Sequence, residues 1–238
     1  PAGSKPERWK PRTYTRYTSS ATPTNGKNTS SEARTARIVI TTNVDGIGPF
    51  EIPVRQEGTP DYLSTIETDV DLGILSRSRV IASVNDDRRD DPRTMWDLIL
   101  WDESIEYDFV GNFTGTGNKF CCKLYTEPIR QNDDNEYFLP NGTYTVTPET
   151  ANPENPDLYY VAGEMEQGKW GYSHPAFPTG TWYIRMANDE VTGDVCISGG
   201  TLTVTRSGEE YTMTFDLTSD AGRKVTGSYR GTLKITAQ

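Results

Sequence analysis

The last third of the chain alternates apolar and polar residues with a period of two. In residues 211–217, Tyr, Met, Phe and Leu occupy every second position, and residues 200–205 alternate in the same way. Because successive side chains of a strand point to opposite faces, and because Ser207-Gly208 between the two runs is a turn signal, this pattern predicts a β-hairpin with one buried face. Residues 224–226 and 228–235 predict the strands that follow.

Shorter strands are predicted upstream. The clearest runs of β-branched and aromatic residues are residues 95–101, 105–110, 119–125 and 143–147, and earlier candidates are 37–42, 52–54 and 72–75. No window sustains a helical period of 3.6 residues. Thr, with 32 residues, is common at the outward strand positions, as expected for a half-exposed pleated surface. We therefore predict an all-β chain, an antiparallel β-sandwich or a barrel-like meander.

The N-terminal segment differs from the rest in composition and charge. Residues 1–36 lack apolar periodicity, which predicts a flexible arm or tether ahead of a β-sandwich domain at 37–238. A second candidate boundary lies near residue 93, after the charged segment 85–92. Residues 1–37 carry eight basic and two acidic side chains, and the remainder carries 16 basic and 32 acidic ones. This acidic body would repel phosphates, so we expect no nucleic-acid partner.

The three cysteines pose the question of a disulfide. Cys121 and Cys122 are adjacent, so in a strand one would face the core and the other would point outward. Pairing of either one with Cys196 stays open from the sequence. We favour three reduced thiols that behave as small apolar side chains. Without a CxxC spacing, and with one histidine in the chain, we expect no metal or cofactor.

Candidate catalytic groups are few. His174 lies in a proline-rich segment, and the chain has no Gly-x-Ser-x-Gly elbow, so we predict no nucleophile and base pair. Asp133, Asp134 and Glu136 offer oxygen ligands that a Ca²⁺ ion could accept. Their run lacks the twelve-residue spacing of an EF-hand, and we favour an Asx-rich turn. The sequence therefore predicts a non-enzymatic protein.

Aromatic residues crowd into one stretch of the chain. Within 25 residues lie Tyr159, Tyr160, Trp170, Tyr172, Phe177, Trp182 and Tyr183. The proline-rich segment 148–180 predicts a long irregular excursion, with a short strand at 158–161. Rings in a loop offer stacking surfaces for sugars or anchors for a protein partner. We take Tyr159, Tyr160, Trp170 and Tyr172 as candidate ligand-binding residues, with a packing role as the open alternative, and we assign Trp182 to a strand core.

Three stretches resemble a known family. They are Leu139-Pro-Asn-Gly-Thr-Tyr-Thr-Val-Thr147, residues 198–217 (SGGTLTVTRSGEEYTMTFDL) and residues 222–233 (GRKVTGSYRGTL). Together, over about residues 94–236, the chain resembles the β-rich surface lipoproteins of Bacteroidetes outer membranes. Many of these are accessory proteins of nutrient-uptake loci built around a TonB-dependent transporter and its lipoprotein lid. They carry a lipidated N-terminal Cys, whereas residue 1 here is Pro, which fits either a processed chain or a removed start Met.

The resemblance implies a function and a location. We expect a non-enzymatic surface lipoprotein, held at the cell surface of the outer membrane by an N-terminal lipid anchor. It would be an accessory or binding component of a glycan or peptide uptake complex, with the TonB-dependent transporter and its lid as partners. The alternatives are a structural or adhesive surface subunit, a viral coat-like protein with its basic arm on nucleic acid, and a carbohydrate-active enzyme.

Overall fold

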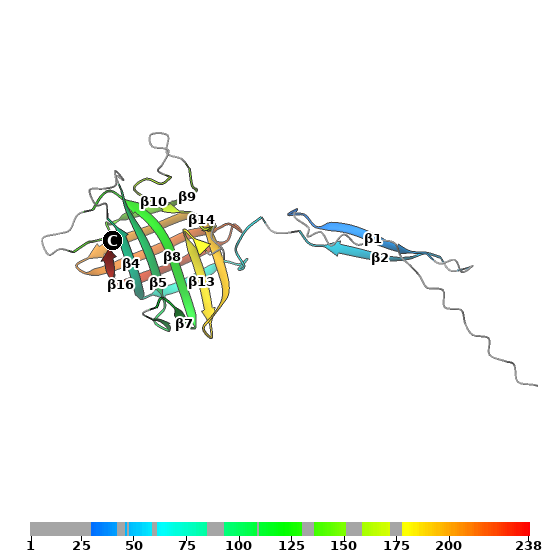
Figure 1. Cartoon of the computed structure of the whole chain (residues 1–238), viewed down its shortest axis with the longest axis horizontal. Coiled ribbons are helices and arrows are strands. Elements are labelled where there is room, and N and C mark those ends of the chain that lie inside the picture. Colours follow the sequence, from blue (N-terminus) through cyan, green and yellow to red (C-terminus); the bar gives the residue numbers. More distant parts are fainter. Residues whose placement is uncertain are drawn as a thin grey trace, which may run out of the picture. The chain divides into compact units, whose positions relative to one another are not determined.

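The computed structural model describes residues 30–41, 46, 48–58, 61–84, 93–108, 110–129, 136–150, 159–171 and 178–238. All regular elements in these residues are β-strands, which confirms the all-β prediction (Figure 1). In chain order they are β1 (Arg34–Ile40), β2 (Phe50–Gln56), β3 (Val70–Leu75), β4 (Arg77–Ser83), β5 (Thr94–Trp101), β6 (Ile105–Tyr107), β7 (Phe113–Gly115), β8 (Gly117–Thr126), β9 (Gly142–Thr147), β10 (Glu164–Glu166), β11 (Lys169–Trp170), β12 (Pro178–Thr179), β13 (Trp182–Ala187), β14 (Glu190–Ser207), β15 (Glu210–Ser219), β16 (Lys224–Thr232) and β17 (Ile235–Ala237).

The chain divides into two compact units between Asp61 and Tyr62. This boundary differs from the two that the sequence predicted, one after residue 36 and one near residue 93. Strands β1 and β2 pair only with each other, so the first unit extends well past residue 36. Strands β4 and β5 are antiparallel neighbours that pair over the whole of β4, so strands on either side of residue 93 belong to the same sheet.

The ribbon of β1 and β2 has one apolar face and one face with both charged and apolar residues. Its register places Ala36, Ile38 and Ile40 opposite Val54, Ile52 and Phe50. These pairs share one face because side chains alternate along a strand, and all six residues are exposed in the first unit. The other face carries an ion pair between Arg37 and Glu51, with 3.2 Å between Nη1 and Oε2.

The second unit is built on one 11-stranded sheet that curls back on itself. Five of its strands form a closed ring, in which β8 pairs β10, β10 pairs β9, β9 pairs β14, β14 pairs β13 and β13 returns to β8. Most pairings are antiparallel, whereas β10 with β9, β16 with β3 and β17 with β4 are parallel. Of the two predicted architectures, the barrel-like one is therefore confirmed, as a closed five-stranded ring with extra strands on both sides.

Strand β14 pairs with three other strands because it bends at Gly199-Gly200. Its first part pairs β13 and its last part pairs β9 and β15, with a register shift after Ile197. Gly200 adopts φ +99°, and a Cβ there would lie 2.3 Å from the Asp216 carbonyl oxygen and 2.5 Å from the Leu217 Cα. A side chain therefore does not fit at this bend.

Two apolar clusters fill the second unit. The larger cluster lies inside the curled sheet. It includes Trp96, Leu98, Phe120, Leu202 and Phe215, each at most 1% exposed. The smaller lies on the outer side of β5, β8 and β13, under the β6–β7 hairpin, and is built from Trp101, Ile105, Trp182, Ile184, Met186 and Cys196. The predicted core role of Trp182 is confirmed.

The cysteines follow the strand alternation. Cys122 lies in the larger cluster and Cys121 packs against the smaller one, as predicted for adjacent strand residues. Cys196 also belongs to the smaller cluster, but Trp182 pairs with Cys121 on one side and with Cys196 on the other. Two strand spacings, about 9–10 Å, exceed the reach of a disulfide. All three thiols are free.

Several predicted elements have different limits. The strand expected at 105–110 ends at Tyr107, and no strand forms at 159–161. The hairpin expected from the C-terminal alternation is present as β14 and β15, which pair from Ile197 to Ser207. In the described part of the chain, no helix has the length and apolar character needed to cross a membrane.

Candidate functional site

The aromatic residues of the excursion are separated by the fold. Tyr160 is 4% exposed and its ring stacks on Tyr125, with the centroids 5.2 Å apart and 10° between the planes. The Arg93 guanidinium donates to the Tyr160 carbonyl oxygen and lies 4.6 Å from the Tyr125 ring centroid. Tyr160 is thus part of a packed ring stack, whereas its neighbour Tyr159 is exposed.

Trp170 lies in a different environment. It is 40% exposed on β11 and packs on Trp182 of β13, with the ring centroids 5.5 Å apart. Among the described residues, no ring contact joins Trp170 to Tyr159 or Tyr160. Tyr172, His174, Asp133 and Asp134 lie outside the described residues. The described members of the candidate aromatic set therefore do not form one surface.

A buried carboxylate lies beneath the ring stack. Glu166 is 8% exposed and accepts a hydrogen bond of 2.5 Å from the Tyr125 hydroxyl. Burial, and then this bond, raise the pKa of Tyr125, so the phenol stays protonated and remains a donor. The Tyr160 hydroxyl is buried without a hydrogen-bond partner, and burial raises its pKa as well. This cluster is closed to a ligand by its own packing.

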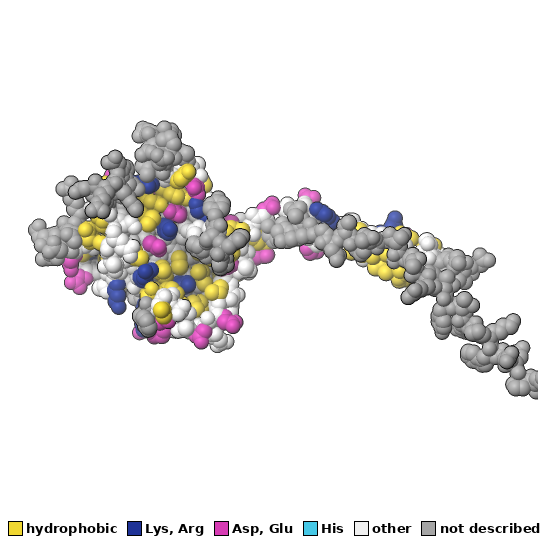
Figure 2. All heavy atoms as spheres, viewed as in Figure 1, with side chains coloured by type: hydrophobic (Ala, Val, Ile, Leu, Met, Phe, Trp, Pro, Cys, Tyr) yellow, Lys and Arg dark blue, Asp and Glu magenta, His cyan; other side chains and the backbone are white. Residues whose placement is uncertain are grey.

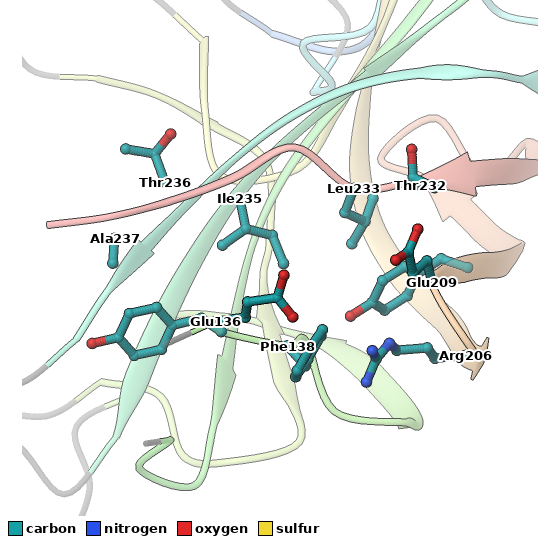
Figure 3. A pocket seen from close by; sticks show the side chains of 11 residues that line it. Glu136, Phe138, Arg206, Glu209, Thr232, Leu233, Ile235, Thr236 and Ala237 are labelled. Carbon is teal, nitrogen blue, oxygen red and sulfur yellow. The ribbon is translucent and has the colours of Figure 1, made fainter. Parts of the chain in front are cut away.

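A large cavity of the second unit lies at an open end of the sheet. It has a volume of about 680 Å³ and is bounded by the segment before β9, the β14–β15 turn and the C-terminal strand (Figure 3). We call it the end groove. Its lining residues are Glu136, Tyr137, Phe138, Arg206, Glu209, Tyr211, Thr232, Leu233, Ile235, Thr236 and Ala237.

Arg206 is the central cation of the end groove. Its guanidinium carbon lies 3.4 Å from the Phe138 ring centroid and 5.8 Å from that of Tyr211. Its Nε–H is buried without an acceptor, and the part of the chain that the structure describes holds no ion pair to it. A buried donor without an acceptor costs about 1–3 kcal/mol. This arrangement therefore lowers the stability of the folded protein when no ligand is bound.

Tyr211 supplies a second unpartnered group in the same place. The residue is 2% exposed, and its hydroxyl is buried with no acceptor for its proton. Burial raises the pKa of its phenol, and the nearby Arg206 charge and the backbone N–H of Leu139 act in the opposite direction. The phenol therefore keeps its proton near neutral pH. Two donors from neighbouring side chains then meet at one wall of the end groove.

Acceptors and apolar surface complete the lining. Glu136 and Glu209 contribute carboxylates, and the Glu136 carboxylate points toward the space in front of Ile235 (Figure 3). Leu233 and Ile235 point into the groove from the C-terminal segment. Donors, acceptors and flat apolar surface in one concave site are what a ligand rich in hydroxyl groups requires.

The sheet register brings the two halves of this site together. Gly142 of β9 pairs with Val204 of β14, so residues before β9 lie beside residues after Val204. This pairing explains how Phe138 meets Arg206. The alternation that turns Leu202 and Val204 inward also turns Arg206 inward. An arginine at a core-facing strand position is therefore the sequence signal for this site, and the pattern of catalytic motifs and loop aromatics did not include it.

The predicted calcium run contributes one residue to the end groove. Glu136 lines it, while the two aspartates that precede it in the run lie outside the described residues. Comparisons of the chain with protein-family models, with curated proteins and with solved structures gave no match.

Proposed function

We propose that residues 62–238 form a non-enzymatic binding module that holds an oligosaccharide in the end groove. One observation carries this proposal: Arg206 Nε–H and the Tyr211 hydroxyl are buried there without acceptors. Buried polar groups are nearly always paired, so an unpaired couple needs a reason. A shift of these two side chains toward the groove would let sugar hydroxyls accept from both donors. The same hydroxyls would donate to the carboxylates of Glu136 and Glu209.

The wider role that we propose follows from the resemblance of about residues 94–236 to surface lipoproteins. In this proposal the chain is an accessory component of a nutrient-uptake complex at the outer-membrane surface, held there by an N-terminal lipid. It would pass its glycan to a TonB-dependent transporter and its lipoprotein lid. Purification of the native protein from membrane extracts, with mass spectrometry of its N-terminus and of co-purifying proteins, tests this part separately.

Calorimetric titration of the full chain with oligosaccharides, selected first on an array of neutral and acidic glycans, tests the module. We expect Arg206→Met and Phe138→Ala to weaken binding at least tenfold, because each removes one partner of the stacked pair. Trp170→Ala is the matched control, since it truncates an aromatic residue outside the groove. Unchanged binding in the groove variants with loss in the control would instead place the site on the aromatic excursion.

The same titrations separate binding from hydrolysis. Glu136→Gln and Glu209→Gln remove the groove's carboxylates one at a time. In a binding module both variants bind more weakly and the bound oligosaccharide is recovered intact. Cleavage of the oligosaccharide by the wild-type protein, lost in either amide variant, would contradict the non-enzymatic proposal and favour a hydrolase with two carboxyl groups across the groove.

A further inference from the structure

A second cavity of about 360 Å³ opens beside the end groove, and we call it the basic pocket. Its lining residues are Ser76, Arg77, Ser78, Arg79, Trp101, Glu106, Tyr107, Thr232, Lys234 and Thr236. The volume falls at the small end of the range for ligand sites, about 300–1,000 Å³. In the view of Figure 2, Lys and Arg side chains lie among hydrophobic ones over the face of β4, β5 and β8.

Charge distinguishes this pocket from its surroundings. Residues 62–238 contain 28 acidic and 15 basic side chains, so the second unit as a whole is strongly acidic. The basic pocket nevertheless holds three cations, Arg77, Arg79 and Lys234, against one carboxylate, Glu106. Three like charges around one small cavity repel one another, and a bound anion would relieve that repulsion.

These cations are weakly engaged within the chain. Arg77 lies 3.7 Å from Glu106, and both side chains are exposed, at 41% and 71%. Such a surface pair contributes only about 0–1 kcal/mol, so a ligand can compete for Arg77. For Arg79 and Lys234, the described residues provide no ion-pair partner. All three can therefore turn toward an anion.

The floor of the pocket is rigid and aromatic. Trp101 is 5% exposed, and its indole N–H donates to the Ile105 carbonyl oxygen at 3.1 Å. The Tyr107 ring lies 5.7 Å from Trp101, and the Arg79 guanidinium lies 5.9 Å from the Tyr107 centroid. A ring with apolar C–H faces can rest on such a floor, as sugars rest on aromatic side chains.

The C-terminal segment is a wall shared by both cavities. Leu233, Ile235 and Ala237 line the end groove, Lys234 lines the basic pocket, and Thr232 and Thr236 line both. The segment is fixed to β4, since the Val80 N–H donates to the Lys234 carbonyl oxygen at 3.1 Å. A chain ligand in the end groove can thus extend over this wall into the basic pocket.

We infer that the basic pocket is a subsite for an acidic sugar residue, one that bears a carboxylate or a sulfate, so that the module selects acidic oligosaccharides. Arg79 and Lys234 bind the anion, Arg77 exchanges its contact with Glu106 for the ligand, and the Tyr107 ring supports the sugar face. The inference rests on the proposed glycan-binding function, because it names the ligand class of the same module.

Titration of the full chain with four probes tests this inference. The probes are a galacturonate pentamer, the same pentamer as its methyl ester, a sulfated galactan hexamer and a single-stranded DNA hexamer. Arg79→Gln combined with Lys234→Gln neutralises the pocket. Arg223→Gln combined with Lys224→Gln is the matched control, because both residues are exposed at the start of β16, at the end away from Thr232.

We expect the wild-type protein to bind an acidic oligomer at least tenfold more tightly than the neutral ester, since charge-assisted hydrogen bonds are the stronger ones. The pocket variant should lose this preference while its affinity for the ester stays unchanged, and the control variant should keep both. Equal binding of acidic and neutral chains, unaffected by the pocket variant, overturns the inference and leaves the proposed function standing.

Other outcomes are equally distinct. Acidic binding that is lost in the pocket variant but unaffected by Arg206→Met supports the pocket and contradicts the end groove as a binding site. DNA binding as tight as that of the acidic sugars, with the same loss in the variant, overturns the inference in favour of a general anion surface. Failure of both acidic oligomers to bind also overturns it.

Discussion

The unpartnered hydroxyl of Tyr211 makes a prediction about stability that runs against the usual effect of a core substitution. Tyr211→Phe removes a hydroxyl that is buried with no acceptor for its proton and keeps a ring that is 2% exposed. An unsatisfied buried hydroxyl costs about 1–3 kcal/mol, and the shape of the side chain changes little. We expect the variant to be more stable than the wild type by about 1 kcal/mol.

A second tyrosine gives the matched control. Tyr144 is 4% exposed, and its hydroxyl donates to the Pro140 carbonyl oxygen at 2.9 Å. Tyr144→Phe removes the same atom from a similar depth but breaks a hydrogen bond, which should cost about 0.5–1.5 kcal/mol. The two variants should therefore differ in sign, and their free energies of unfolding should differ by about 2 kcal/mol.

Urea unfolding at pH 7, followed by tryptophan fluorescence, measures both changes. Calorimetry should show the Tyr211→Phe midpoint about 2–4 °C higher for a unit of this length, while glycan binding becomes weaker. If Tyr211→Phe is destabilised as much as Tyr144→Phe, the Tyr211 hydroxyl has a partner in solution. The end groove would then hold no unsatisfied donor at Tyr211, which would refute the proposed binding site there.

Three further predictions concern the scaffold. Gly200→Ala should lower the free energy of unfolding by more than about 2 kcal/mol, because the Cβ would collide with the backbone of β15. Gly199→Ala is its control. Nothing lies within 4 Å of the Cβ at this position, so the free energy of unfolding should change by less than about 1 kcal/mol. Burial raises the thiol pKa values from 9.0 to about 11 for Cys121 and about 12 for Cys196. The folded state therefore holds these protons more tightly, so the urea midpoint should be level below pH 9 and fall between pH 9 and 12. Little thiol reagent should be consumed before unfolding. Tyr125→Phe should cost about 1.5–3 kcal/mol in urea unfolding, because its buried carboxylate partner loses a donor; a neutral result would mean that water replaces the phenol.

Local patterns in the sequence were sufficient to predict the strands and the faces on which their side chains lie. In β15 every second residue from Tyr211 to Leu217 is buried, as the alternation required. Adjacent cysteines point to opposite faces for the same reason. Such predictions succeed because the strand period is a property of the backbone, independent of which strands become neighbours.

The site depends on pairing between distant strands, which the pattern does not contain. Phe138 and Arg206 meet because Gly142 pairs with Val204, and nothing local to either residue indicates this register. Tyr160 shows the reverse case. Its proline-rich surroundings left both a binding and a packing role open, and the Tyr125 ring on β8 covers it. Whether a loop aromatic is exposed is decided by its partner strand, so composition could not separate binding from packing there.

The ribbon of β1 and β2 has a consequence for measurements in solution. Antiparallel ribbons of two strands are marginally stable in water on their own, and this one exposes Ile38, Ile52 and Phe50 along one face. The exchange rate of its cross-strand amide hydrogens therefore reports what lies against that face. Rapid exchange in the isolated protein that slows in a cell extract would reveal a partner without any need to know its identity in advance.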